Sequence, residues 1–157
     1  MDSFLARRLS GVDLEAGSLI SGCGALFFSQ DTKRYLFLLR AGKRYPNTWG
    51  LVGGKIEQNE SIIVALTREI IEEVGFSPEI QRIIPIETFT ADNLQFCYHT
   101  FVCSVKNEFI PILNSEHRGY CWTSLGCYPK PLHPKVWDTF SFNVIHNKLE
   151  LIESTFS

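Results

Sequence analysis

The chain contains 157 residues, of which 45% are hydrophobic and 20% charged, and this is the composition of an ordinary globular protein. We therefore expect a single domain spanning residues 1–157. The net charge of −2 gives no electrostatic reason to expect nucleic acid or an anionic membrane as the main partner.

No feature of the sequence indicates export. Residues 1–17 lack an uninterrupted apolar core and no later run reaches membrane-spanning length, so we expect a cytoplasmic protein. The five cysteines are odd in number and form no CxxC pair, so we expect reduced thiols rather than a zinc site or disulfides. The sequence leaves open whether the chain forms a homodimer.

The first part of the chain is predicted to be rich in strands. We interpret residues 1–17 as a cap containing a short helix at residues 4–9. Apolar runs bounded by turn residues predict strands at residues 19–29, 34–40 and 49–52. The first two should form a hairpin, because only a polar turn separates them. Gly53 and Gly54 follow the third strand and permit a sharp turn and close approach by a ligand.

A long helix is predicted at residues 61–74. Gly75 suits the left-handed position that ends a helix, and the Ser77-Pro78 pair prevents its continuation. At about 100° per residue, one side of this helix carries apolar residues that we expect in the core. These residues are Ile63, Leu66, Ile70 and Val74.

The remainder of the chain is predicted to contain further strands and a second helix. Strands are predicted at residues 79–90, 94–105, 109–113 and 120–123, with a polar loop at residues 114–119. A second helix is predicted from Pro134, with an apolar stripe made of Val136, Trp137, Phe140, Val144 and Ile145. The order β-β-β-α-β-β-β-α, with hairpin connections, favours an α/β (α+β) fold in which helices pack on a mixed sheet.

Three glutamates on the first helix break a local rule. Glu69, Glu72 and Glu73 lie at i, i+3 and i+4, so they share one face near the helix C-terminus, where anions are disfavoured and repel one another. A bound cation would relieve this, and all-oxygen ligation suits Mg²⁺ first and Mn²⁺ second. Metal-bridged phosphate chemistry is one function of such a cluster, and a solvated acidic face is the alternative.

The spacing around these glutamates is specific. Gly54, Glu60 and the run REIIEEVGF at residues 68–76 match every fixed position of GX5EX7REUXEEXGU, where U is aliphatic or aromatic. Average composition produces this match on the order of once in a billion starting positions. The sequence thus resembles the Nudix family, in which this pattern is called the Nudix box. The run WGLVGGKIE also resembles the start of the box in MutT-like members, with Val52 where many relatives have proline.

The resemblance implies an α/β/α sandwich and Mg²⁺-dependent hydrolysis of a nucleoside diphosphate linked to another group. The metal ligands that it implies are the Gly53 carbonyl, Glu69, Glu72 and Glu73. Glu60 and Arg68 would brace the loop against the helix, although Arg68 and Glu72 are also an ordinary i,i+4 pair. Besides Glu72 and Glu73, the resemblance makes Glu116 a catalytic candidate, because a late loop glutamate often completes the site in MutT-like enzymes.

Residues outside the box are weaker candidates. Arg40 and Arg44 are expected to face the phosphates, and Tyr45 to stack on a base, with a solvated strand end or a core aromatic as the alternatives. His117 matches the spacing of the catalytic histidine of GDP-mannose hydrolases, but the intact box favours a surface histidine. The other histidines, His99, His133 and His146, are expected to be structural.

The substrate is the least determined feature. Phe89, Phe96, Tyr98 and Phe101 are candidates for a base pocket, although strand alternation places half of them in the core. We favour a nucleoside triphosphate or modified nucleotide as substrate. Nucleotide sugars such as GDP-mannose, ADP-ribose and dinucleoside polyphosphates are the alternatives, followed by a non-catalytic nucleotide-binding module.

Overall fold

The computed structural model describes residues 19–156, so the cap predicted at residues 1–17 lies outside the described part. This part contains seven strands: β1 (Ile20–Ser29), β2 (Tyr35–Arg40), β3 (Trp49–Gly50), β4 (Val52–Lys55), β5 (Ile80–Thr90), β6 (Phe96–Val105) and β7 (His117–Thr123). Its helices are α3 (Ile62–Val74), the short 3-10 helix η1 (Leu125–Cys127), α4 (Pro134–Phe140) and α5 (Asn143–Thr155).

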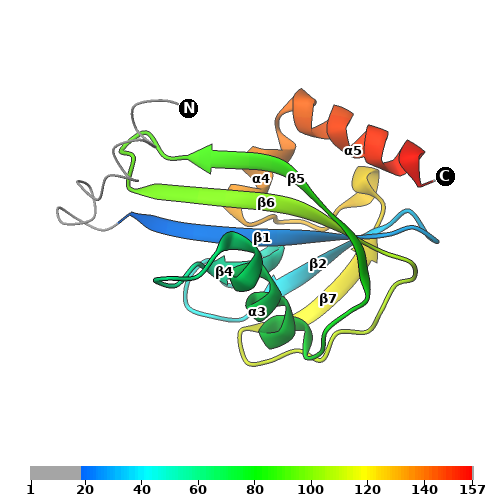
Figure 1. The fold of residues 1–157 in the computed structure, drawn as a ribbon. Coiled ribbons are helices and arrows are strands. Elements are labelled where there is room, and N and C mark those ends of the chain that lie inside the picture. The colour runs from blue at the N-terminus through cyan, green and yellow to red at the C-terminus, as the bar shows by residue number, and fades with distance from the viewer. Residues whose placement is uncertain (1–18, 157) are drawn as a thin grey trace.

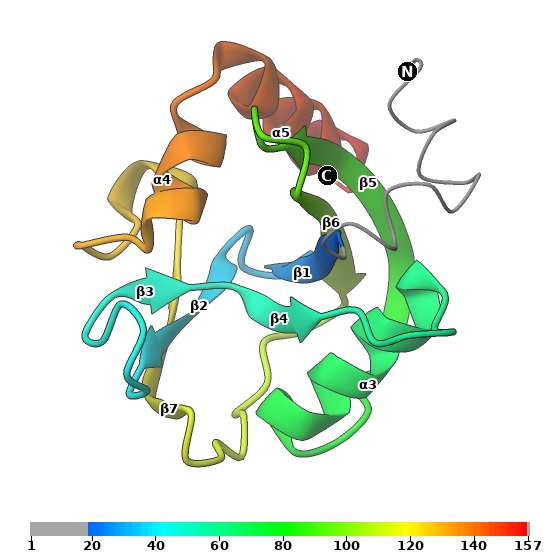
Figure 2. The same ribbon diagram turned by 90° about the vertical axis from the view of Figure 1, so that its left-hand side faces the viewer.

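The strands form one mixed sheet between helices. The order is β3-β2-β1-β6-β5, with β4 pairing with β1 and β7 pairing with β2. β1 and β6 are parallel, whereas the other pairs are antiparallel. Figures 1 and 2 show α3 on one side of the sheet and α4 with α5 on the other. The predicted mixed-sheet α/β/α sandwich is therefore confirmed, as are the β1–β2 and β5–β6 hairpins.

Each face of the sheet has its own apolar core. On the α3 side, Leu66 and Ile70 pack with Phe27 of β1 and Trp122 of β7. On the other side, the helices contribute Val136, Phe140, Ile145 and Leu149, which pack with Phe28 and Phe37. Because residues alternate along a strand, β1 contributes Phe27 to one core and Phe28 to the other.

Helix α3 has the predicted ends, but the face that it buries differs from the predicted one. Ser61 accepts a hydrogen bond from the backbone N–H of Val64, and Gly75 ends the helix at φ 87°. The prediction that Ile63 lies in the core is wrong, because it is 47% exposed. Glu69 and Glu73 are buried instead, at 8% and 4% exposure, so the face toward the sheet includes two of the three glutamates.

Two segments beside the site differ from their predicted structure. Gly53 and Gly54 lie within β4, paired with Gly24 and Cys23, so they permit close approach of β1 rather than a sharp turn. The strand predicted at residues 109–113 is wrong, because this segment is an irregular connection. Pro111 has no N–H to donate to a sheet, and the ring of Phe109 fills the core between the sheet and α3.

The predicted C-terminal helix is two helices. α4 ends at Phe140, where the Ser141 hydroxyl donates to the Asp138 carbonyl, and α5 begins at Asn143. The two helices present different apolar faces to the sheet. Trp137 and Val144, predicted in one stripe, are consequently 59% and 55% exposed.

The cysteines agree with the sequence-based expectation of reduced thiols. All five cysteines are free thiols, as predicted. Within residues 19–156, no helix has the length and apolar character that crossing a membrane requires.

Candidate functional site

Glu73 occupies a buried position between α3 and the sheet. Its Oε1 atom accepts a hydrogen bond of 2.6 Å from the backbone N–H of Gly53, and its Oε2 atom lies 3.6 Å from Nδ1 of His117. Burial, followed by the charges of Glu69 and Glu116, raises the pKa of Glu73 to about 8 despite the Gly53 hydrogen bond. A carboxylate buried in this way is stabilised by a nearby cation.

Glu69 depends on the absence of a side chain at Gly54. A Cβ atom on Gly54 would lie 2.5 Å from Oε1 of Glu69, so only glycine leaves room for the carboxylate. Burial raises the pKa of Glu69, and the charges of Glu72 and Glu116 act in the same direction. The second glycine of the pair thus makes space for an acidic side chain.

Arg68 joins the loop after β4 to helix α3. Its Nε and Nη2 atoms donate to both carboxylate oxygens of Glu60 at 2.7 and 2.9 Å, and Nη2 also donates to the Lys55 carbonyl at 2.9 Å. Its Nη1 atom contacts Glu69 at 2.9 Å and Glu72 at 3.4 Å. The guanidinium lowers the pKa of Glu60 to about 2. These contacts are the ones that a brace between loop and helix requires.

Arg68→Met is expected to lower the free energy of unfolding by about 2 kcal/mol, because it leaves Glu60 and Glu69 without their charged donor. Arg68→Lys should recover little of this, since an ammonium cannot make the bidentate contact. Urea denaturation measures the difference. Arg34 makes a comparable bidentate contact with Glu108 at a more exposed position, so Arg34→Met should lower the free energy of unfolding less than Arg68→Met does. Equal losses in the two variants would contradict a special role for Arg68.

Glu116 is linked to helix α3 through Asn114, and its negative charge contributes to the raised pKa of both Glu69 and Glu73. The Asn114 side-chain amide donates to the Glu72 carbonyl at 3.0 Å and to Glu116 at 3.4 Å, so it links the two segments. The structure thus brings together Glu116 and the box glutamates.

His117 is not at the surface, and the prediction that placed it there is wrong. β7 begins at His117 rather than after residue 119, and the side chain points inward with a residue exposure of 6%. Its Nδ1 atom is buried without a hydrogen bond and lies 3.6 Å from Oε2 of Glu73. Burial, with a smaller effect of Arg40, lowers the pKa of His117 to about 4, so the ring is neutral at pH 7.

The donor chemistry of this cluster fits a hard divalent cation. Glu69, Glu72, Glu73 and the Gly53 carbonyl offer only oxygen atoms, and the two buried carboxylates repel each other. Among residues 19–156 no three His, Cys, Asp or Glu side chains are already arranged as a metal site. Arg68 and the Gly53 N–H instead hold the carboxylates through hydrogen bonds.

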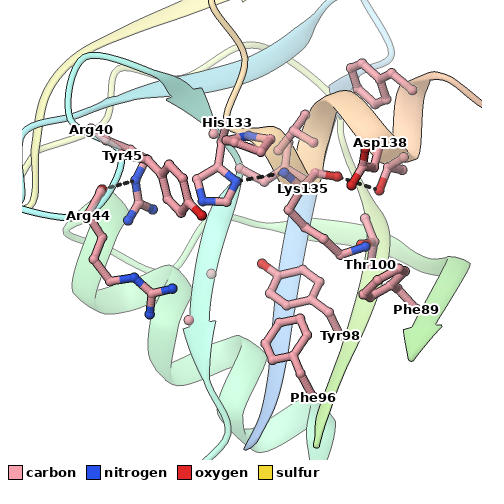
Figure 3. Close-up of a pocket in the computed structure, with 18 residues that line it drawn as sticks. Arg40, Arg44, Tyr45, Phe89, Phe96, Tyr98, Thr100, His133, Lys135 and Asp138 are labelled. Atoms are coloured by element: carbon pink, nitrogen blue, oxygen red, sulfur yellow. Dashed lines mark hydrogen bonds between the residues drawn. The ribbon is translucent and has the colours of Figure 1, made fainter. Parts of the chain in front are cut away.

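A cavity of about 460 Å³ opens on the α4 side of the sheet and reaches Gly53 and Gly54. Arg40, Arg44 and Tyr45, the predicted substrate-binding residues, all line it (Figure 3). The Arg40 Nε atom donates to the Arg44 carbonyl at 3.2 Å, which ties the end of β2 to the following loop.

Aromatic side chains of β5 and β6 form another wall of the cavity. Phe89, Phe96 and Tyr98 line it, whereas Phe101 packs against the core on the α3 side, as strand alternation requires. Phe96 and Tyr98 stack with ring centroids 6.1 Å apart and an interplanar angle of 27°. Such a wall can hold a planar heterocycle.

The sequence reasoning missed the residues that α4 contributes. Lys135 lies with Nζ 3.6 Å from the Phe89 ring centroid and 3.5 Å from Glu87, and Asp138 also faces the cavity. His133 was expected to be structural and does cap α4, since its Nδ1 accepts from the Lys135 N–H, but it also packs on Tyr45 beside the cavity. The polar Lys135 and Asp138 within an apolar stripe were the available signal.

An α/β/α sandwich that places buried carboxylates beside a cavity with arginine and aromatic walls is suited to phosphate esters of planar heterocycles. The NUDIX domain family model matches residues 20–141. Dihydroneopterin triphosphate diphosphatase of Haemophilus influenzae is 34% identical over 114 residues, which are 63% of this chain and 70% of that protein. Nucleoside triphosphatase NudI of Escherichia coli is 34% identical over 106 residues, which are 59% of this chain and 74% of that protein.

Solved structures agree with these sequence matches. A MutT NUDIX hydrolase from Burkholderia pseudomallei has a TM-score of 0.66 at 22% identity, covering 82% of this chain and 97% of that one. The Escherichia coli dihydroneopterin triphosphate pyrophosphohydrolase has a TM-score of 0.51 at 25% identity, and the match covers 68% of this chain and 83% of that one. The chain therefore belongs to the Nudix family of hydrolases.

Proposed function

We propose that this enzyme hydrolyses the pyrophosphate linkage of a nucleoside triphosphate, or of a related triphosphate carrying a planar heterocycle, and releases pyrophosphate and a monophosphate. The observation that carries the proposal is the cavity, which joins an aromatic wall to Arg40, Arg44 and the Gly53–Gly54 start of the box. The names of two relatives, a dihydroneopterin triphosphate diphosphatase and a nucleoside triphosphatase, support the same substrate class.

The α3 cluster is the part that we assign to metal binding. Glu69, Glu72, Glu73 and the Gly53 carbonyl would hold Mg²⁺, or Mn²⁺ in its place. When bound, the cation supplies positive charge beside the phosphate oxygens and lowers the pKa of nearby water. The Arg68 contacts hold Glu69 and Glu72 close to this position, and the Gly53 N–H holds Glu73.

The remaining groups bind the substrate and accept a proton. Arg40 and Arg44 would offset the phosphate charge at the cavity wall, and Tyr45, 45% exposed beside them, would cover the heterocycle or the sugar. Glu116 is exposed next to the α3 glutamates, so we assign its carboxylate as the base that takes the proton of the attacking water. Water forms one new P–O bond as the bridging P–O bond breaks.

A product-resolved screen tests this function. Purified protein with Mg²⁺ is incubated separately with nucleoside triphosphates, dihydroneopterin triphosphate, ADP-ribose, GDP-mannose and a dinucleoside polyphosphate. We expect monophosphate and pyrophosphate from a triphosphate. Turnover confined to ADP-ribose, a nucleotide sugar or a dinucleotide would replace the proposed substrate class. Tight nucleotide binding without release of phosphate, pyrophosphate or monophosphate would identify a non-catalytic binding module.

The organisation of the chain in the cell stays a prediction. A single domain over residues 1–157 and a cytoplasmic location rest on the sequence alone, which leaves open whether the chain forms a homodimer. Size-exclusion chromatography with light scattering measures the oligomeric state directly.

A further inference from the structure

The ring of a tyrosine on β6 fills the space that side chains would take at two glycines of the neighbouring strand β1. A Cβ atom added to Gly22 would lie 2.8 Å from Cδ2 of Tyr98, and one added to Gly24 would lie 2.5 Å from its hydroxyl oxygen. Side-chain atoms do not approach so closely, so an alanine at either position is incompatible with the present position of the ring. The SGCG run of the sequence therefore holds Tyr98 against the backbone of β1.

Tyr98 is also part of the cavity, where its ring lies beside Phe96 and opposite the Lys135 side chain (Figure 3). Gly22 pairs directly with Tyr98 in the parallel β1–β6 ladder, and Gly24 pairs with Gly53 of β4. The glycines thus lie under the ring at the place where the aromatic wall meets the start of the Nudix box.

We propose that Gly22 and Gly24 determine substrate specificity because they let the Tyr98 ring lie directly against the backbone of β1. This position of the ring makes the cavity deep enough for a planar heterocycle. The inference rests on the proposed triphosphatase function and assigns the heterocycle to the face of the Phe96–Tyr98 pair. A side chain on β1 would displace the Tyr98 ring from the sheet into the cavity, because the backbones of β1 and β6 are fixed by their ladder. The ring would then occupy the space of the heterocycle.

The geometry distinguishes the two glycines. At Gly24 the nearest atom is the Tyr98 hydroxyl oxygen, and the next ring atoms are 3.1 and 3.2 Å away. At Gly22 the nearest atoms are ring carbons at 2.8 and 2.9 Å. Removing the hydroxyl with Tyr98→Phe therefore relieves most of the conflict at Gly24 and none of the closest contacts at Gly22.

Steady-state kinetics with the best triphosphate substrate of the screen tests the inference. Gly24→Ala and Gly22→Ala should each raise KM about tenfold with a much smaller change in kcat. Adding Tyr98→Phe should restore KM in the Gly24→Ala background, relative to Tyr98→Phe alone, but not in the Gly22→Ala background. Gly119→Ala is the control on β7, because its Cβ would meet Leu39 at an ordinary 3.5 Å.

Several results would overturn the inference. An unchanged KM in both alanine variants would do so, and so would equal rescue of both by Tyr98→Phe. If the alanine variants do not fold, Tyr98→Leu provides the second test, because loss of the aromatic face should raise KM while thermal melting remains cooperative. An unchanged KM in Tyr98→Leu would then exclude the stacking role. Failure of the wild-type protein to hydrolyse any triphosphate would instead refute the proposed function.

Discussion

Glu73→Gln is expected to lower kcat by roughly a thousandfold in the presence of Mg²⁺ while the fold persists, since several kcal/mol of metal-dependent stabilisation are lost. The glutamine oxygen can still accept the Gly53 N–H, so the local hydrogen bond is retained. What disappears is the negative charge that Glu73 would carry next to Glu69 when the cation is bound. Glu72→Gln should have a comparable effect from a side chain that is 49% exposed.

The stability of Glu73→Gln provides an independent measurement. Because the folded-state pKa of Glu73 is raised to about 8, the contribution of Glu73 to the stability of the metal-free wild-type protein falls as pH rises from about 4.5 toward 8. A neutral amide has no such penalty, so Glu73→Gln in EDTA at pH 7.5 should melt at or above the wild-type temperature. Full activity of either purified glutamine variant would exclude these carboxylates from catalysis. A large fall in melting temperature would instead identify Glu73 as mainly structural.

Local chemistry made helix α3 predictable and left its orientation undetermined. Ser61 and Gly75 mark its ends in any environment, because a side-chain cap and a left-handed residue act within one turn. The buried face depends on what packs against it. Gly54 leaves room for the Glu69 carboxylate, and the Gly53 N–H binds Glu73, so two glutamates face the sheet while Ile63 is exposed. Hydrophobicity alone therefore assigned the wrong residue to the core.

The cavity required tertiary information. Tyr98 and Phe101 lie on the same strand and are both aromatic, and only the direction of alternation relative to α3 decides which one lines the cavity. Lys135 and Asp138 line it from α4, which ends at Phe140 and is followed by the separate helix α5. No pattern within that segment specifies its distance from β6. The box residues could be named from the sequence because their spacing is specific, and their assignment to metal binding stays a prediction.

Gly53→Ala is expected to lower the free energy of unfolding by about 3 kcal/mol, which corresponds to a fall in melting temperature of roughly 6–12 °C. An added Cβ would clash with the Cys23 carbonyl oxygen and would lie 2.7 Å from the Gly24 Cα. Both are backbone atoms of β1, which is held by β4 on one side and β6 on the other, so neither can move alone. Displacing β4 also moves the N–H that binds Glu73, so activity falls as well.

Gly54→Ala separates stability from activity at the neighbouring position. The three atoms nearest to its Cβ would all belong to the carboxylate end of Glu69, the closest at 2.5 Å, and a side chain can rotate away. We therefore expect a loss of activity with a smaller fall in melting temperature than for Gly53→Ala. Gly42→Ala is the control, since no atom lies within 4 Å of its added Cβ. Thermal melting measures the stability of the three variants, and turnover in Mg²⁺ measures their activity. If Gly53→Ala melts like Gly42→Ala, the close approach of β1 does not determine the geometry of the box.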